Sequence, residues 1–591
     1  MKVNELLVKF LVWRIKHIDN RNFVLLLSGV IGALAGLAAV LLKQSVHLIH
    51  QALTLSFKTE YANYLYLSYP LIGILLTVLF AHFVLKEKLG HGVTDILYTI
   101  SKKSSIIQRG KMYSRMITSA LTVGFGGSVG LEAPIVVTGS AIGSNIGRLM
   151  HLNYKKRTIL LGCGAAGAIS AIFNAPIGGV IFCVEVILAE ISIASFIPLL
   201  IASVFGSIVS LLLLGDDVLF SVKVTDLFKA SDTPYYLMLG IVCGLASLYF
   251  TRATYWVEGK IGGIKKTYKR ILIGGLLLGL IIFVLPPIYG EGYESIKALL
   301  SNNGSGFLNR SLFFSSGGSP YILLFFALAV FIAKPIASAL TISSGGSGGV
   351  FAPSLFSGGV IGFCFAIGIQ MLLGEPISVS NFTLVGMCGV MSGVLHAPLT
   401  AIFLIAEITG GYELFVPLML VSAISYVTIS YFEKHSIYTK HLVERGDLIQ
   451  HDKDRQVLSL IDMNKIIETD LLTIEPTRSL GDLVELIKVS KRNVFPVVND
   501  KGELMGIVTL DDIREVMFDE ASQNNLTIKE LMHSPPAVVS SYDSMATVMK
   551  KFEETHAWNL PVIDNGKYTG FISKSRIFNA YRNRLIRQHA E

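Results

Sequence analysis

Long apolar runs follow one another through most of the chain and stop where charged residues return. From about Phe23 to Phe432 the segments are dominated by aliphatic and aromatic residues, whereas from Glu433 onward the charge density is that of a soluble domain. An α-helix needs about 20 apolar residues to cross a bilayer. The pattern therefore predicts an all-α, multi-pass membrane domain followed by a soluble domain.

The apolar segments are of two kinds. Segments long enough to span a bilayer are Phe23–Val46, Tyr64–Leu85, Tyr235–Trp256, Ile271–Ile288 and Pro320–Thr341. Shorter segments, interrupted by Gly or Pro, are Gly124–Gly147, Ile159–Asn174, Pro176–Ala189, Gly358–Leu373, Val385–His396 and Pro398–Ile408. Paired short segments in two halves are typical of transporters whose site lies between broken helices near the middle of the membrane.

The membrane domain also repeats itself. Gly126–Pro134 reads GGSVGLEAP and Gly345–Pro353 reads GGSGGVFAP, so both fit the frame GGSxGxxAP. Further along, Gly164–Pro176 matches Gly386–Pro398 at two glycines, a serine and the final Ala-Pro. Two matching blocks in the same order indicate that one half of this domain is a duplicate of the other.

The two GGSxGxxAP peptides, called here the glycine strips, suit an anion. In hydrocarbon every backbone N–H needs an acceptor, and a helix N-terminus offers such groups with a partial positive charge. Close helix packing through small residues is the alternative. Because the strips form a matched pair beside interrupted helices, we favour an anion site. They differ at one telling position, where Glu132 corresponds to Phe351.

The content and distribution of charged residues are typical of a membrane protein. Only 16% of the 591 residues are charged, and the net charge of +8 is concentrated in short basic loops, as the positive-inside rule expects of cytoplasmic segments. We therefore expect an inner (plasma) membrane protein with cytoplasmic N- and C-termini and no nucleic-acid partner. Segment 1–22 is basic and lacks a cleavage site, so we expect an interfacial helix. The cysteines have no metal spacing, so we expect small buried hydrophobes and no metal.

Motifs in order along the chain resemble those of the CLC family of chloride channels and proton-coupled chloride transporters. Gly90-His91-Gly92-Val93-Thr94 resembles the family's GSGIP strip, Gly130-Leu131-Glu132-Ala133-Pro134 resembles GREGP, and Gly349-Val350-Phe351-Ala352-Pro353 resembles GxFxP. Tyr438 stands where the family has an anion-contacting tyrosine. The resemblance covers about residues 20–445 and implies antiparallel duplicated helices, a homodimer, and one chloride pore per subunit.

The resemblance assigns roles to particular residues. Glu132 is similar to the gating glutamate, whose carboxylate occupies an anion position when ionised and swings away when protonated. The hydroxyl of Tyr438 and the amides of Val350 and Phe351 are expected to hold the central anion, with His91 and Gly92 contributing from the first motif. Interfacial anchoring is the alternative for Tyr438, and helix capping is the alternative for Glu132.

Three departures from the family pattern matter. His91 replaces a coordinating serine, so either its ring or only its backbone amide serves an anion. Thr94 replaces the proline of the GSGIP strip. Leu131 replaces the basic neighbour of the gate, and because a nearby opposite charge favours ionisation, we expect this gate to protonate more readily than in relatives with arginine.

Proton coupling is open from the sequence. Family exchangers often carry an inner glutamate that passes protons to the gate, and this position is Val186, which favours a passive voltage- or pH-gated channel over a chloride/proton antiporter. Glu185 is adjacent, but one residue is about 100° around a helix. Glu185 aligns with Glu407 in the repeat, which predicts a structural role for both.

The soluble tail is a second duplication. After a linker at 446–460, residues 461–520 and 526–585 each read as helix, strand, tight turn, strand, helix, and they resemble a pair of CBS domains, giving an α/β cytoplasmic unit. The resemblance implies adenine nucleotide binding, with Thr509 and Asp512 as the contacts. The second copy has Ser573 but Arg576 in place of the acid, so one nucleotide site is favoured over two. A purely structural pair is the alternative.

Two other classes of protein fit less well. A CBS-regulated cation transporter needs several convergent carboxylates in the membrane, where acids are sparse here. A nucleotide sensor without transport has no use for duplicated strips or for Glu132. The sequence therefore favours movement of chloride or another small anion, with protons as a possible second ion and no cofactor needed for transport.

Overall fold

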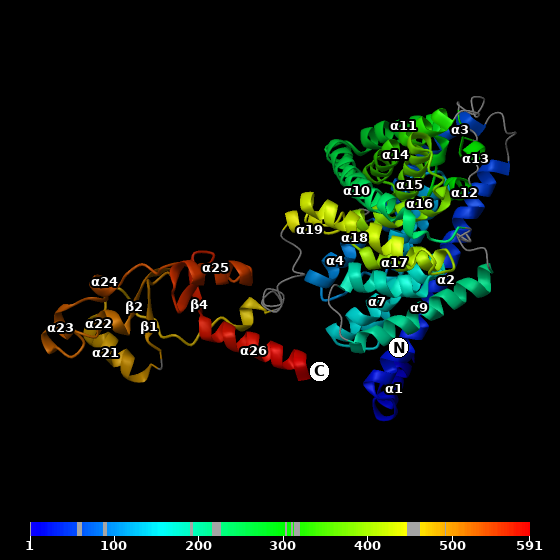
Figure 1. Ribbon diagram of the computed structural model, residues 1–591. Helices are drawn as coiled ribbons and strands as arrows, with labels where there is room; N and C mark the ends of the chain where they lie inside the picture. Colours follow the sequence, from blue (N-terminus) through cyan, green and yellow to red (C-terminus); the bar gives the residue numbers. More distant parts are fainter. Residues whose placement is uncertain are drawn as a thin grey trace. The chain divides into compact units, whose positions relative to one another are not determined.

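The computed structural model describes residues 2–55, 62–86, 92–188, 193–215, 226–301, 304–308, 311, 320–445, 461–490 and 492–590. The chain divides into two compact units, Met1–Leu448 and Ile449–Glu591 (Figure 1).

The described part of the first unit is built from helices. In chain order they are α1 (Lys2–His17), α2 (Asn20–Leu55), α3 (Ala62–Phe80), η1 (Ala81–Leu85), α4 (Val93–Lys102), α5 (Lys111–Gly124), α6 (Glu132–Leu149), α7 (Tyr154–Phe173), α8 (Pro176–Phe182), η2 (Cys183–Leu188), α9 (Ile193–Leu214), η3 (Ala230–Asp232), α10 (Thr233–Gly262), α11 (Thr267–Val284), η4 (Pro286–Ile288), α12 (Tyr293–Leu300), α13 (Gly304–Leu308), α14 (Pro320–Ser343), α15 (Phe351–Leu373), α16 (Val379–Leu395), α17 (Pro398–Ile408), α18 (Phe415–Phe432) and α19 (Lys440–Glu444).

Within the described residues, nine helices are long and apolar enough to cross a membrane. Two segments predicted to be short belong to such helices. Helix α7 begins at Tyr154 because the side chain of Asn153 accepts a hydrogen bond from the amide of Lys156, so the basic residues expected in a loop form the first turn. Helix α15 begins inside the second glycine strip, at Phe351. Helices α9 and α18 are spans that the sequence prediction missed.

The two halves pack alike around small residues. Helix α6 packs on α7, and α15 packs on α16. A Cβ atom on Gly139 of α6 would lie 2.1 Å from the carbonyl oxygen of Gly164, and one on Gly358 of α15 would lie 2.4 Å from that of Gly386. Glycine inside these helices therefore allows backbone contact. Close helix packing through small residues, the alternative explanation given for the strips, is found at these glycines within the helices.

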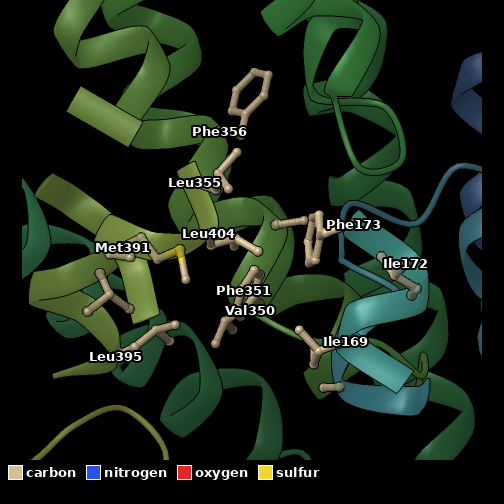
Figure 2. Packing of buried hydrophobic residues seen from close by; sticks show 14 of the residues in the cluster. Ile169, Ile172, Phe173, Val350, Phe351, Leu355, Phe356, Met391, Leu395 and Leu404 are labelled. Carbon is tan, nitrogen blue, oxygen red and sulfur yellow. The ribbon is translucent and has the colours of Figure 1, made fainter. Parts of the chain in front are cut away.

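Apolar side chains from both halves fill the centre of the unit. Figure 2 shows Phe173 of α7 and Phe351 of α15 close to each other, with Leu404 of α17 nearby. The ring of Phe351 lies 5.5 Å from that of Phe173 and 5.9 Å from that of Phe182. Such aromatic contacts stabilise beyond simple burial, so the start of α15 is held firmly against the first half.

Glu185 and Glu407 cap helices across the duplication. The carboxylate of Glu185 accepts hydrogen bonds from the amides of Leu399 (3.1 Å) and Thr400 (2.7 Å) at the start of α17. The carboxylate of Glu407 accepts hydrogen bonds from the amides of Ile177 (2.9 Å) and Gly178 (2.7 Å) at the start of α8. An acid at a helix N-terminus is stabilising. The predicted structural role of both acids is confirmed.

The second unit consists of two matching halves. Its elements are η6 (Met463–Lys465), α21 (Leu480–Val489), β1 (Val494–Val498), β2 (Leu504–Thr509), α22 (Leu510–Ile513), α23 (Glu520–Asn525), α24 (Ile528–Leu531), α25 (Met545–Thr555), β3 (Asn559–Asp564), β4 (Lys567–Ser573) and α26 (Lys574–Ala590). Strands β1 and β2 pair antiparallel, and so do β3 and β4.

The halves of the second unit exchange edge contacts. His533 of the second half bridges to Ile507 of β2 in the first half, and Glu468 of the first half bridges to Phe571 of β4 in the second half. The amide of Tyr568 also donates to the carbonyl of Gly502 (2.9 Å). Units of about 60 residues have little core of their own, and these contacts join the two into one body, as predicted.

Candidate functional site

The two glycine strips lie side by side and hydrogen-bond to each other. The amide of Gly130 donates to the carbonyl of Gly349 (2.9 Å), and the amide of Gly349 donates to that of Gly130 (2.9 Å). Reciprocal bonds also join each strip to the other half. The amide of Ser128 donates to the Thr341 hydroxyl (3.2 Å), and the amide of Ser347 donates to the Thr122 hydroxyl (2.9 Å). Segments more than 200 residues apart thus form one paired backbone structure.

Glycine is needed where the strips turn and touch. Gly126 and Gly345, which are equivalent in the repeat, have φ of +90° and +108°, a region that favours glycine. At the crossing point, a Cβ atom on Gly349 would lie 2.6 Å from the Cβ of Ala133. The equivalent distance from Gly130 to the Cβ of Ala352 is 2.9 Å. The close approach brings the starts of α6 and α15 together.

Glu132, the first residue of α6, lies at this junction. Its side chain is only 1% exposed. One carboxylate oxygen, Oε1, accepts a hydrogen bond from the Tyr293 hydroxyl (2.5 Å). The other, Oε2, has no partner in hydrogen-bond geometry among the described residues, although the backbone amides of Glu132 and Ala352 act on the carboxylate and favour its ionised form. A Cβ atom on Gly130 would lie 1.9 Å from Oε2. The acid therefore lies folded against the first strip, close to the amides at the starts of α6 and α15.

Tyr438 lies beside the second strip. A small cavity of about 40 Å³, called here the Tyr438 cavity, is lined by residues of both strips and of the C-terminal segment of the unit, among them Ala133, Val350 and Tyr438. The Tyr438 hydroxyl is buried and has no partner among the described residues. A buried polar group without a protein partner points to a water or an ion beside it, and the cavity is large enough for one.

Residues of the Gly90–Thr94 motif also contact Ala133 and Tyr438. Gly92 caps α4 with a φ of +63°, and a Cβ atom there would lie 3.1 Å from the Cβ of Ala133. The Thr94 hydroxyl donates to the carbonyl of Tyr438 (3.0 Å). Gly92, Val350 and Tyr438 thus lie beside Ala133, the residue after Glu132, while Phe351 turns its ring into the apolar core. His91 lies outside the described residues.

Three functional candidates were missed by the sequence prediction: Glu291, Tyr293 and Lys334. Lys334 of α14 is fully buried, and its ammonium donates to the carbonyls of Ile288 (3.2 Å), Gly290 (3.0 Å) and Glu291 (3.4 Å). It also acts electrostatically on Glu132. Leu131 supplies no positive charge beside Glu132. Lys334, on a helix distant in the sequence, supplies one instead. The available signal was a lone lysine within an apolar span, since ionisable residues in such spans are functional candidates.

A larger cavity adjoins Leu131, the residue before Glu132. It has a volume of about 830 Å³ and is called here the α2 cavity, because Lys43, His47 and His50 of α2 line it together with Leu131, Glu291 and Tyr293. The two residues that flank Glu132 thus line different cavities, Leu131 the α2 cavity and Ala133 the Tyr438 cavity.

No acid takes the place expected of an inner proton donor on η2. Val186 is buried, 8% exposed, and the neighbouring Glu185 is engaged in capping α17. The Tyr438 cavity does contain two titratable groups, Glu258 and His441. Oε2 of Glu258 lies 3.3 Å from Nε2 of His441.

Substituting Gly130 is expected to displace the Glu132 carboxylate. The new methyl group of Gly130→Ala would overlap the present position of Oε2 and lie 2.9 Å from the Cβ of Ala352, so the carboxylate must move and the two strips must separate slightly. A displacement free energy of about 1.4 kcal/mol raises the displaced fraction about tenfold. On the chloride path that the motif resemblance implies, chloride flux in liposomes is expected to rise at neutral pH. The control is Gly368→Ala on α15, where a Cβ meets nothing within 4 Å; equal flux from both variants would contradict this placement of Glu132.

In the second unit, Thr509 and Asp512 form a capping box at the start of α22. The amide and hydroxyl of Thr509 both donate to Oδ2 of Asp512 (2.7 Å each), and Nε2 of His533 lies 3.1 Å from the same oxygen. Partial burial opposes ionisation of Asp512, but these hydrogen bonds and the imidazole of His533 outweigh it and lower its pKa. The carboxylate is held ionised and partly exposed.

The equivalent place in the second half is different. The Ser573 hydroxyl donates to the carboxylate of Glu468 (2.6 Å), and the amide of Arg576 donates to that hydroxyl (3.2 Å). Glu468 also forms an ion pair with Arg492 (2.6 Å). The serine is therefore already engaged by an acid, which disfavours a phosphate there.

Family models match both units. The model described as voltage gated chloride channel matches residues 72–430, and that of the CBS domain matches residues 463–519 and 528–583. The chain is 27% identical over 414 residues to the H(+)/Cl(-) exchange transporter ClcA of Vibrio cholerae, covering 68% of this chain and 84% of that protein. It is 26% identical over 569 residues to the chloride channel protein CLC-f of Arabidopsis thaliana, covering 84% and 70%.

Solved structures share the fold. A slow cyanobacterial Cl-/H+ antiporter has a TM-score of 0.62 at 21% identity, covering 73% of this chain and 99% of that one. A eukaryotic CLC transporter has a TM-score of 0.60 at 18% identity, covering 94% and 97%. The predicted fold class, a helical membrane domain of this type with a C-terminal CBS pair, is confirmed.

Proposed function

Because the chain belongs to the CLC family of voltage gated chloride channels and carries a C-terminal pair of CBS domains, we propose that it moves chloride across a membrane along the paired glycine strips. The observation that carries this proposal is the junction of α6 and α15. Two helix N-termini meet there beside the carboxylate of Glu132 and the hydroxyl of Tyr438, which are both buried. Oε2 of Glu132 and the hydroxyl oxygen of Tyr438 have no partner in hydrogen-bond geometry among the described residues.

Helix ends and hydroxyls suit chloride better than a buried lysine would. A fully charged cation in contact with the ion would hold it too tightly, and conduction requires binding that is weak enough to release the ion. The amides at the start of α15 and the Tyr438 hydroxyl supply partial charges instead. We assign the central anion position to Tyr438, Val350 and Phe351, with Gly92 beside it.

Glu132 serves as the gate in this proposal. An ionised carboxylate folded on the first strip competes with chloride for the same donors, and protonation removes that competition. The 2.5 Å bond from Tyr293 and the tight fit against Gly130 hold the side chain in the blocking position. Release of the gate then requires a proton and the loss of one hydrogen bond.

Passive conduction is the form of transport we favour, because Val186 cannot relay a proton. A chloride/proton antiporter is the alternative, and one observation favours it: Glu258 and His441 line the Tyr438 cavity beside the proposed anion position. We propose that this cavity opens toward the cytoplasm and the α2 cavity away from it, since the basic loops predict a cytoplasmic start of α2. The protein acts as a homodimer in an inner or plasma membrane, as in the family.

Flux measurements separate these possibilities. The purified full chain is reconstituted in liposomes, a chloride gradient is imposed, and chloride and protons are recorded together. We expect chloride efflux without uphill proton movement. Uphill proton movement would establish the antiporter, and chloride efflux no faster than from protein-free liposomes would overturn the proposed function.

The CBS pair is proposed to bind one adenine nucleotide, at Thr509 and Asp512. Asp512→Ala removes the carboxylate available to a ribose, so we expect nucleotide affinity, measured by calorimetry on the full chain, to fall about tenfold, the loss expected for one hydrogen bond to a charged group. The matched control is Glu530→Ala, because Glu530 closes the same capping box on Thr527 at α24. Each variant loses one cap. Equal affinities in the two variants would contradict this site.

A further inference from the structure

Glu291 is the acid that contacts both the α2 cavity and the segment of the gate. It lies between η4 and α12, and its Oε1 accepts a hydrogen bond from the amide of Leu131 (3.3 Å), the residue before Glu132. Its side chain also lines the α2 cavity. Glu132 itself is 1% exposed. Glu291 is therefore placed to couple the solvent in this cavity to the gate.

Charged and titratable groups line the α2 cavity together with Glu291 or act on it from neighbouring elements. They are Lys43, His47 and His50 of α2, Tyr66 of α3, Glu132 of α6, Tyr289 before it, Tyr293, Glu294 and Lys297 of α12, and Lys334 of α14. The fully buried cation in this set is Lys334, and it acts on both Glu132 and Glu291. Two acids thus depend on one buried ammonium.

The two carboxylates are held differently. Glu291 lines the cavity. Burial and the nearby Glu132 raise its pKa above the ordinary value, although the hydrogen bond from the Leu131 amide and the cations Lys43 and Lys334 act in the opposite direction. Glu132 is enclosed, with Oε2 unpaired. Hydrogen bonds and cations favour the charged form of an acid, whereas enclosure disfavours it. The two carboxylates share one buried cation, and the ionised form of each raises the proton affinity of the other.

An ionised neighbour increases the attraction of an acid for a proton. Resting on the proposed chloride transport, we propose that Glu291 is a positioning residue of the gate: its negative charge at the wall of the α2 cavity raises the proton affinity of Glu132 and so sets the pH at which the gate opens. Its hydrogen bond to the amide of Leu131 fixes the distance between the two charges.

Glu291→Gln tests this inference. Glutamine keeps an acceptor for the amide of Leu131 but removes the charge. Chloride flux is measured in liposomes over a series of pH values, equal on both sides so that orientation does not matter. We expect the pH of half-maximal flux to fall by about one unit, a tenfold higher proton concentration, as two charges within a partly buried site interact by this much or more. Glu291→Asp is expected to restore most of the shift.

The control is Glu294→Gln, an exposed acid lining the same cavity, which is expected to leave the midpoint within a few tenths of a unit. A pH-responsive wild type with the same midpoint in Glu291→Gln would overturn this inference while leaving the proposed function intact. An equal shift in both variants would also overturn it, by indicating a general surface charge effect. No wild-type flux would overturn the proposed function itself, and this inference with it.

Discussion

Replacing Glu132 by glutamine is expected to abolish the pH dependence of chloride flux. Glutamine has nearly the same shape and still accepts the hydrogen bond from Tyr293, but it carries no charge at any pH. In the wild type the ratio of ionised to protonated gate changes about tenfold per pH unit around its midpoint. In Glu132→Gln this titration is absent, so flux measured from acidic to neutral pH stays at the level of the open wild type.

Two comparisons make the Glu132 experiment decisive. Glu294→Gln removes an exposed acid near the same cavity and is expected to keep the wild-type pH response. Combining Glu132→Gln with Glu291→Gln is expected to behave as Glu132→Gln alone, because the second acid acts through the first. A persistent pH response in Glu132→Gln would place the gate elsewhere.

Loss of Lys334 is expected to have the largest effect on stability. Its ammonium satisfies three backbone carbonyls and compensates Glu132 and Glu291, and it is fully buried. Lys334→Met keeps the length of the side chain but leaves these acceptors and acids without their cation. Removing one partner of a buried charge set costs about 3–5 kcal/mol. We expect the apparent melting temperature of the purified protein to fall by about 5 °C or more.

Lys297→Met is the control for Lys334, since Lys297 is an exposed lysine that also lines the α2 cavity. Its melting temperature is expected to match that of the wild type. Lys334→Met is further expected to move the pH of half-maximal flux upward, because Glu132 loses the cation that favours its ionised form. A stable Lys334→Met protein with wild-type pH dependence would show that this lysine neither supports the fold nor acts on the gate.

The features that the sequence predicted well lie in short motifs that occur in both halves of the duplication. The strips GGSVGLEAP and GGSGGVFAP predicted a paired structure, and the structure joins them through Gly130 and Gly349. The alignment of Glu185 with Glu407 predicted a shared structural role, and each caps a helix of the other half. A duplicated pattern constrains both copies, so one copy supports the interpretation of the other.

The features that were missed depend on distant contacts or on weak boundaries. Lys334, Glu291 and Tyr293 meet Glu132 only through folding, across more than 150 residues, and none lies in a repeated motif. Helix α9 was missed because its apolar run continues from that of α8 and η2 with only Glu185 and Glu190 as interruptions. Periodicity alone does not divide such a run into two helices.

The claim that chloride lies between the paired strips is tested most directly by locating the anion. Crystals of the full chain grown with bromide in place of chloride would reveal the ion by its anomalous scattering. A bromide peak is expected within hydrogen-bond distance of the Tyr438 hydroxyl and of the amides of Val350 and Phe351. Chloride transport by the same protein with no bromide at this position would contradict the proposed path.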